Sequence, residues 1–310
     1  MQNYDFRGDK VSPEIGQIGQ ILRQARNYDQ QIRLIHGRGG NYPGLEFLTV
    51  DYYQPILVVY LHHHRDLEWC AALKEELEGN FPFALIQDRS IKKAAYIYSW
   101  GEPKEEHIAE EDGLKYHVAF SSKSQNCGFF PDMHVGRTFL SEISHNCKVL
   151  NLFAYTCSLS VAALKGGALH VDNMDLSSLS LSIGRNNHRL NEMPLNQVSF
   201  FKDNIMKSFG KLRKKGPYDI VILDPPTFQK GSFDVERDYA KILRRMPDFI
   251  RKGGLVLACL NSPHHDNIFL RQLFEQQPGF VFQRNIQQSA EFPEKNPEAG
   301  LKMQLYHYME

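Results

Sequence analysis

The chain has 310 residues, 42% of them apolar, and it carries 36 basic and 36 acidic residues, so its formal net charge is zero. This length suits two domains with cores of their own, and the neutral balance argues against a protein that grips long nucleic acids non-specifically over its whole surface. Five cysteines without repeated close spacing argue against a disulfide framework or a zinc cluster. The N-terminus is polar and no apolar run approaches the ~18 residues of a membrane span, so we expect a cytoplasmic protein that does not enter a membrane and binds no metal.

Residues 1–121 show the pattern of a small helical and α+β accessory domain. Ser12 and Pro13 form a typical helix start, and the apolar spacing that follows predicts a helix over 15–33. A dense turn signal occupies 37–44. Beyond it we expect strands at 48–53, 55–61, 83–87, 95–100 and 116–120, a helix at 66–78 and an acidic loop at 101–113.

From Lys148 onward, short apolar runs alternate with longer amphipathic stretches. The runs predict strands at 148–154, 170–174, 198–202, 218–223 and 255–260, separated by helices at 158–165, 177–191, 205–214 and 239–249. This rhythm requires a mostly parallel sheet with helices on both faces. Segments 280–283 and 303–308 could pair as a terminal antiparallel hairpin. We therefore expect a Rossmann-like α/β domain over 122–310.

The loop Asn151–Ser158 joins the first of these strands to its helix. In such sheets, ligands bind at the carboxyl ends of the strands, and the free N–H groups of a helix N-terminus favour an anionic group such as a carboxylate. An ordinary connection with Ser158 as N-cap explains the same residues equally well.

Polar residues also follow the second and third strands. Asp175 can accept both ribose hydroxyls of an adenosine, whereas Asp172 falls inside the strand. Asp203, with Asn204 beside it, can bind an adenine amino group. Each acid alone is more often a helix cap, so the prediction of one adenosine ligand rests on their succession. The Gly-x-Gly-x-x-Gly motif of dinucleotide binding is absent, which disfavours NAD and FAD.

The strongest single motif is Asp224-Pro225-Pro226-Thr227-Phe228, after the fourth strand. The two prolines lack N–H donors and stiffen the loop, so that the Asp224 carboxylate and the proline carbonyls can face a cleft. Phe228 offers a face on which a flat base can stack, an interaction worth ~1–3 kcal/mol. The alternative is a turn with an apolar plug.

Taken together, these motifs resemble a family of 23S rRNA methyltransferases that includes cytosine-C5 and guanine-N7 enzymes. The likeness covers 33–310 and is carried by RLIHGRGGNYPGL, DGLKYHVAF, CGFFPDMHVGR and VLNLFAYTCSLSVAALKGGA. The motif DPPTF, followed by FDVERDY, is similar to the guanine-N7 members in particular.

The resemblance implies a class I methyltransferase domain that binds S-adenosylmethionine, an RNA partner such as ribosomal RNA, and a possible homodimer. In this reading Asp175 holds the ribose, and Asp203 with Asn204 the adenine. The remaining residues that the resemblance assigns are Phe153, Tyr155, Thr156 and Ser158 around the methionine part, Asp224 and Pro225 at the transfer site, and Asp132 and Arg137 closing over the cofactor.

This sequence departs from the family at three points. Cys157 stands where the family has glycine, and this position tolerates a side chain only if its φ is negative. If φ is positive, we expect a strained loop and weaker cofactor binding. His134 replaces the first arginine of the linker motif. A helical N-terminus stands in place of the RNA-binding PUA module of many cytosine-type members.

Methylation of cytosine C5 requires a cysteine thiolate that adds to C6, and the residues here favour a nitrogen acceptor instead. Asn261 occupies the position of that cysteine, and we expect the nearby Cys259 to be a buried core thiol. A nitrogen with an exposed lone pair needs only orientation and proximity, which Asp224, Pro225, Pro226, Phe228 and Asn261 can supply.

Two other functions remain open on the sequence alone. The neutral charge and the missing module allow a methyltransferase for a protein or a small molecule, and Cys157 allows a non-catalytic binding module. The basic runs at 211–215 and 244–252 are typical of solvated helix faces, although one of them would follow an RNA backbone if RNA binds.

Overall fold

The computed structural model describes residues 12–25, 31–91, 94–104, 106–120, 126–229 and 231–310. The chain divides into two compact units, each with a hydrophobic core of its own. Unit 1 consists of residues 1–109 and 119–127, and unit 2 consists of residues 110–118 and 128–310. None of the helices in the described part of the chain has the length and apolar character that crossing a membrane requires.

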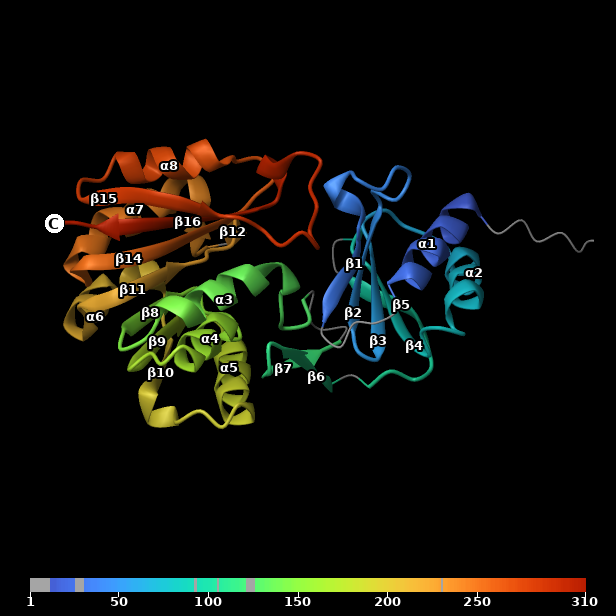
Figure 1. Ribbon diagram of the computed structural model, residues 1–310, viewed down its shortest axis with the longest axis horizontal. Helices are drawn as coiled ribbons and strands as arrows, with labels where there is room; N and C mark the ends of the chain where they lie inside the picture. The colour runs from blue at the N-terminus through green and yellow to red at the C-terminus, as the bar shows by residue number, and fades with distance from the viewer. Residues whose placement is uncertain (1–11, 26–30, 92–93, 105, 121–125, 230) are drawn as a thin grey trace, which may run out of the picture. The chain divides into compact units, whose positions relative to one another are not determined.

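Unit 1 is a five-stranded sheet in the order β1-β2-β3-β4-β5, in which only β3 and β4 are parallel. Helices α1 and α2 lie together on one side of it (Figure 1). Ile15, Ile18 and Leu22 of α1 are fully buried because their spacing places them on one helix face. The elements are α1 (Pro13–Gln24), β1 (Ile32–His36), β2 (Leu48–Tyr53), β3 (Ile56–Leu61), α2 (Leu67–Leu77), β4 (Phe83–Asp88) and β5 (Ala95–Trp100).

Two predictions for the N-terminal region are wrong. The helix predicted to reach Arg33 ends at Gln24, and Ile32 and Arg33 instead pair with β2; residues 26–30 lie outside the described part. The acidic segment is not a loop, because β6 (Glu106–Glu111) and β7 (Leu114–Ala119) form a hairpin. Its turn is Asp-Gly with positive φ at both residues, a strong hairpin signal that the charge count concealed.

Unit 2 contains a seven-stranded sheet in the order β10-β9-β8-β11-β14-β16-β15. The first five strands are parallel, and β16 runs antiparallel to both β14 and β15. The predicted Rossmann-like fold with a terminal antiparallel pair is therefore confirmed. The strands of the sheet are β8 (Lys148–Leu152), β9 (His170–Asp175), β10 (Val198–Lys202), β11 (Tyr218–Leu223), β14 (Ile250–Asn261), β15 (Phe280–Ile286) and β16 (Leu301–Tyr308).

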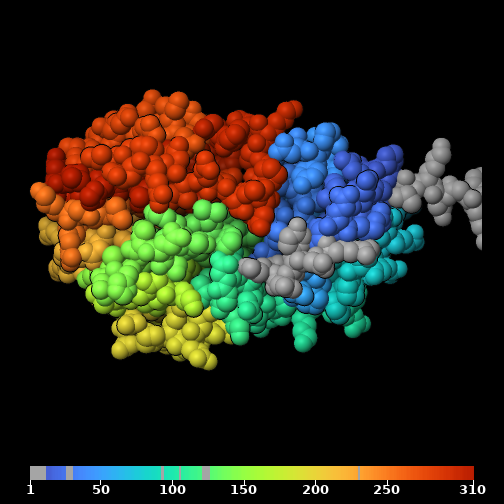
Figure 2. Space-filling view, viewed as in Figure 1, coloured from blue at the N-terminus to red at the C-terminus, as the bar shows by residue number. Residues whose placement is uncertain are grey.

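Helices cover both faces of this sheet. Along β11, Val221 and Leu223 belong to a core with α6, α7 and α8, whereas Ile220 and Ile222 belong to a core with α3 and α4, as the alternation of a strand requires. In the space-filling view, α3 to α5 (green) and α8 to β16 (orange to red) form one continuous surface of unit 2 (Figure 2). The helices are α3 (His134–Ile143), α4 (Ser158–Lys165), α5 (Ser178–Leu190), α6 (Phe209–Lys215), α7 (Val235–Arg245) and α8 (Asn267–Glu275).

Two of these helices, α3 and α8, were not predicted from the sequence. Helix α3 buries Phe139 and Leu140 on one face, and α8 buries Leu270, Leu273 and Phe274. Both are short, so their apolar stripes contain too few residues to stand out in the sequence.

A buried lysine supports the loop that follows β14. Only 2% of Lys302 is exposed, and its Nζ donates to the carbonyl oxygens of Ser262 (2.6 Å), Gly300 (2.7 Å) and Glu298 (2.8 Å). Burial lowers the pKa of this ammonium group. This single side chain thereby supplies donors to three carbonyl groups, and those of Ser262 and Gly300 belong to buried residues.

We predict that Lys302→Met lowers the free energy of unfolding by about 3 kcal/mol, because methionine keeps most of the volume but leaves the carbonyls without a donor. Urea denaturation of the purified protein measures this. The exposed Lys252→Met is the control and should change the unfolding free energy by less than about 0.5 kcal/mol. A similar small change for Lys302→Met would contradict the prediction.

Candidate functional site

Residues predicted for the site follow five neighbouring parallel strands of unit 2 where each strand ends, and four of the five are polar. In the order of the sheet they are Asp203 after β10, Asp175 at the end of β9, Phe153 after β8, Asp224 after β11 and Asn261 at the end of β14. Because the strands are parallel, these ends share one edge of the sheet, which we call the carboxyl edge. The fold thus brings the residues predicted for cofactor and acceptor to the same edge.

The loop after β8 has an unusual backbone. Phe153, Tyr155 and Cys157 all have positive φ, at 58°, 47° and 61°. The condition for tolerating a side chain at Cys157 is therefore not met, and the left-handed conformation costs roughly 1–2 kcal/mol at such a residue. Clustering of this strain in one loop is typical of functional sites. The alternative of an ordinary helix start with Ser158 as N-cap is also wrong, because Cys157 is the N-cap and makes no side-chain cap hydrogen bond.

Asp175 holds this loop from the neighbouring strand. Its Oδ2 accepts a hydrogen bond from the Tyr155 N–H (2.9 Å), and its Oδ1 accepts one from the Ser177 N–H (2.8 Å). The side chain remains partly exposed, and a carboxylate has about four lone-pair sites, so two are left for further donors. Asp172, by contrast, is buried inside β9 and accepts from the Tyr218 hydroxyl (2.7 Å).

Thr156 anchors the same loop on the other side. It is buried; its Oγ1 donates to the Gly128 carbonyl (2.6 Å), and its own carbonyl accepts from Asn187 Nδ2 (2.9 Å). Both bonds are made inside the protein. Thr156 therefore fixes the path of the loop.

At the end of β10 the two predicted residues have partners in the protein. Asp203 pairs with Lys211 Nζ at 2.5 Å. Asn204 Oδ1 accepts from the Met206 N–H (2.9 Å) and caps a short 3₁₀ helix, η4 (Ile205–Lys207), which is a common role for asparagine. Both side chains are partly exposed at the carboxyl edge.

Among the acidic residues at this edge, Asp224 has the most strongly shifted pKa. Burial and, to a smaller extent, the nearby Asp132 carboxylate together raise the pKa of its carboxyl group to about 7. The residue nevertheless keeps some accessible surface. Thr227 Oγ1 donates to the Asn261 carbonyl (2.7 Å) and so ties the loop after β11 to the one after β14.

Two aromatic residues beside the loops of the carboxyl edge are exposed and so are not apolar plugs. Phe228, in the short strand β12 (Phe228–Gln229) that pairs with β13 (Phe233–Asp234), is 66% exposed. Phe130, which was not predicted, is 41% exposed and lies against the Tyr155 ring at 5.5 Å between centroids. Two exposed aromatic faces at a polar edge are suited to flat ligands.

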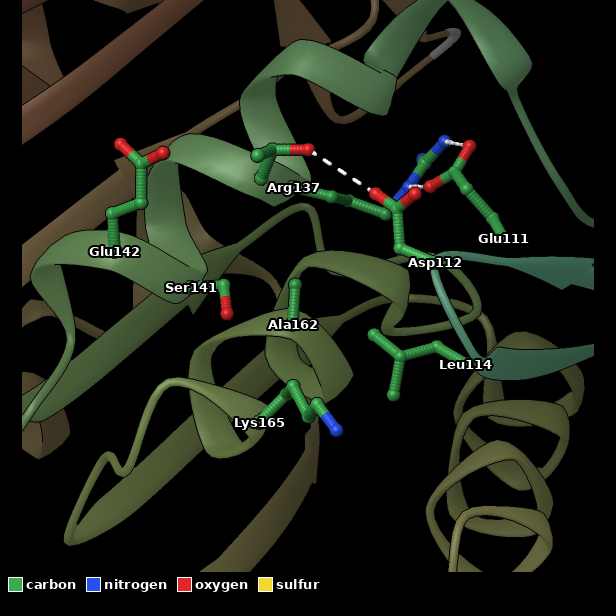
Figure 3. Close-up of a pocket in the computed structure, with 9 residues that line it drawn as sticks. Glu111, Asp112, Leu114, Arg137, Ser141, Glu142, Ala162 and Lys165 are labelled. Carbon is green, nitrogen blue, oxygen red and sulfur yellow. Dashed lines mark hydrogen bonds and ion pairs between the residues drawn. The ribbon is translucent and has the colours of Figure 1, made fainter.

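Arg137 orders the segment that carries Phe130 and Asp132. Its guanidinium is buried and donates to both carboxylate oxygens of Glu111 (2.5 and 2.7 Å) and to the Phe130 carbonyl (3.1 Å). Figure 3 shows the bidentate pair beside a cavity of about 220 Å³ between the β6–β7 turn, α3 and α4. No other predicted site residue lines that cavity. A direct contact between Arg137 and a cofactor stays a prediction.

The strained Cys157 is matched by a glycine on α5. A Cβ added at Gly184 would lie 2.4 Å from Cys157 Sγ and 3.0 Å from its Cβ. We predict that Gly184→Ala destabilises unit 2 by about 2 kcal/mol through overpacking. In a Cys157→Gly background the same change should be close to neutral, because the gain of about 1 kcal/mol in helix propensity offsets the one tight contact that remains, 3.3 Å to the Thr156 carbonyl carbon.

Thermal denaturation of the four proteins in this double-mutant cycle measures the coupling energy. A coupling of about 2 kcal/mol or more is expected. Strictly additive effects would show that the thiol can move aside.

Comparison with known proteins shows which family this chain is similar to. The family described as S-adenosylmethionine-dependent methyltransferase matches residues 32–307. Ribosomal RNA large subunit methyltransferase I of Photobacterium profundum is 30% identical over 248 residues, covering 76% of this chain and 62% of that protein. Methyltransferase K/L of a Psychrobacter strain is 34% identical over 158 residues, covering 48% of this chain and 19% of that protein. The chain thus spans less than two thirds of the length of these relatives.

Solved structures agree on the fold. A chain described as a SAM-dependent methyltransferase from Streptococcus mutans superimposes with a TM-score of 0.81 at 23% identity, covering 95% of this chain and 80% of that one. The SMU.776 structure, complexed with SAH, gives a TM-score of 0.83 at 24% identity with the same coverage. Because the family match extends over most of its length, this chain belongs to the S-adenosylmethionine-dependent methyltransferases.

Proposed function

We propose that this protein is an enzyme that transfers a methyl group from S-adenosylmethionine to a base of ribosomal RNA. The observation that supports this most directly is the carboxyl edge of unit 2, which holds Asp224 and the strained loop that Asp175 binds. The names of the relatives motivate the acceptor. We further propose that residues 122–310 form the catalytic domain and residues 1–121 the accessory domain.

The residues present at this edge fit the cofactor. The two remaining lone-pair sites of Asp175 suit a ribose, and Asp203 with Asn204 suits the adenine. The loop proposed to bind the methionine part contains Phe153 and Tyr155 and ends at Ser158. The hydrogen bonds of Thr156 hold this loop in place. When bound, S-adenosylmethionine supplies a methyl group on a positively charged sulfonium.

The side chains next to Asp224 define the proposed transfer site. Its carboxyl group titrates near neutral pH, so it can donate a hydrogen bond when protonated and accept one when ionised. Asp132 adds negative charge beside it, and Arg137 keeps the Asp132 segment ordered. The exposed Phe228 ring can stack a base against the rigid loop of Pro225 and Pro226.

A nitrogen acceptor, as in the guanine-N7 members, fits the site better than cytosine C5. Cys259 is fully buried in β14, and burial raises the pKa of its thiol well above the ordinary value, so it is not available as a thiolate nucleophile. Asn261 is exposed at the end of the same strand. Its amide can orient a base without adding to it.

The function is tested with tritiated S-adenosylmethionine and ribosomal RNA from cells that lack this protein. We expect label in that RNA and none in RNA from cells that have it, because the sites there are already methylated. Mass spectrometry then identifies the nucleotide, and the appearance of 5-methylcytosine would contradict the nitrogen acceptor. If the protein binds S-adenosylmethionine in calorimetry but methylates only proteins or small molecules, the acceptor is not RNA. If it binds no cofactor, the protein is a non-catalytic binding module.

Two further expectations follow from a ribosomal acceptor. We propose that the enzyme acts in the cytoplasm, where ribosomal RNA is found in bacteria. A homodimer, as the family resemblance suggests, is checked by sedimentation of the full chain.

The perturbed acid at the transfer site makes a prediction for stability. The native pKa of Asp224, about 7, lies above the ordinary 3.8, so its contribution to stability is present below about pH 4 and is lost as the pH rises towards 7. Asn mimics the protonated group. The free energy of unfolding of Asp224→Asn, relative to that of the wild type, should therefore increase from pH 5 to pH 8 by up to about 2 kcal/mol.

Thermal denaturation at the two pH values measures this gain. Thr227→Val alters the same loop without removing an acid, and it should shift the melting temperature equally at both. A gain for Asp224→Asn that does not grow with pH would show that the native carboxyl group is ionised throughout.

A further inference from the structure

Exposed basic side chains gather on one part of unit 2, between β10 and the start of β14. The segments 198–219 and 244–252, together with Lys148, hold eleven basic and three acidic residues, although the whole chain has no net charge. Ten of the eleven side chains are exposed and Lys148 is partly so. We call these eleven residues the basic stripe: Lys148, Lys202, Lys207, Lys211, Arg213, Lys214, Lys215, Arg244, Arg245, Arg251 and Lys252.

Contacts within unit 2 join the stripe into one surface. Lys211 and Lys215 of α6 both lie over the Phe201 ring of the edge strand β10, at 4.5 and 5.1 Å. Arg245, at the end of α7, lies 5.9 Å from the Phe209 ring at the start of α6.

Contacts also join the part of the stripe that lies where β8 and β14 begin. Lys148 Nζ donates to the Lys215 carbonyl, and its backbone N–H donates to Asp219 Oδ2 (2.8 Å), whose other oxygen pairs with Arg251 (2.7 Å). The stripe therefore extends from Lys202, where β10 ends at the carboxyl edge, to the beginnings of β8 and β14.

The charge of the stripe is not neutralised by the protein. Its three acids each pair with one stripe residue: Asp203 with Lys211, Asp219 with Arg251 and Asp248 with Arg245. A surplus of eight positive charges remains, and in a neutral chain such a local excess creates a potential that attracts anions.

Helix chemistry explains only part of this excess. The basic residues in the last turns of α6 and α7 complement the negative end of each helix dipole. Lys202, Lys207, Arg251 and Lys252 lie in strands or in the 3₁₀ helix, where this explanation does not apply. None of the exposed large apolar side chains among the described residues falls in these segments, which disfavours insertion into a membrane.

We propose that the basic stripe binds the phosphate backbone of the RNA whose base enters the carboxyl edge. This inference rests on the proposed RNA acceptor and names the surface that holds the rest of that RNA. Lysine and arginine contacts to phosphate supply affinity without reading sequence. They also position the strand, so that a single base reaches the transfer site beside Asp224 and Phe228 at the same carboxyl edge.

The test compares two triple charge reversals with the same change in net charge. Lys207→Glu/Arg213→Glu/Lys214→Glu removes stripe residues and spares Lys211, which pairs with Asp203. Lys115→Glu/Lys165→Glu/Arg189→Glu reverses three exposed residues on β7, α4 and α5 as the control. Affinity for a labelled fragment of large-subunit ribosomal RNA is measured by fluorescence anisotropy between 50 and 200 mM KCl.

For the stripe variant we expect at least a ten-fold loss of affinity and a slope of log K against log salt that is lower by about 2, since each lost phosphate contact removes about 0.7. The control should lose less than about three-fold, because screening limits charge effects beyond about 8 Å. Calorimetry with S-adenosylmethionine should give the wild-type affinity for both variants. Should the reversal unfold the protein, the neutral Lys207→Gln/Arg213→Gln/Lys214→Gln variant should show the same change in slope.

Failure of the stripe and failure of the function give different results. If the wild type methylates ribosomal RNA but the stripe variant keeps its affinity and salt slope, the stripe is overturned and the enzyme stands. If the wild type neither binds nor methylates this RNA, both fall. Equal weakening by the two triples would point to net charge alone and would also overturn the stripe.

Discussion

The cofactor loop after β8 is the constraint on which the rest of unit 2 depends. Three residues without glycine's freedom hold left-handed conformations there, and a strained backbone persists only where its surroundings determine it completely. Asp175 binds its N–H from β9, while Asn187 and Gly128 fix Thr156 from α5 and from the segment before α3. The loop therefore depends on contacts from both sides, and it can hold this conformation only when the sheet and the neighbouring helices have packed together.

The same edge concentrates unfavourable charge. Asp224 and Asp132 lie near each other in a region dense enough to hold the Asp224 carboxyl group partly protonated at neutral pH, a cost to stability of the kind that active sites often carry. A cationic ligand would relieve it. The buried pair of Arg137 and Glu111 keeps the Asp132 segment in place, so acidic residues of the β6–β7 hairpin serve the order of this edge.

The predicted strands and their order of appearance came from local patterns. Continuous apolar runs from Lys148 onward locate the parallel strands closely, since a buried strand leaves few polar positions. The polar residues that end these strands were identified for the same reason. Prediction failed where the pattern was short or masked by charge: in β1, in β6 and its turn to β7, and in α3 and α8. In β1 the pairing with β2 decided the structure, in the hairpin the Asp-Gly turn did, and in the two short helices the burial of a few apolar side chains did.

The sequence by itself determined the fold class of unit 2, the residues at the ends of its strands and the family motifs, because each of these is written in a contiguous stretch of chain. Only the tertiary structure decided the properties that depend on distance and burial. These are the positive φ of Cys157 and its packing against Gly184, the raised pKa of Asp224, and the pairing of Arg137 with Glu111. It also joined the separate basic runs into one stripe. These properties arise between residues far apart in the chain, and no local pattern records which of them meet.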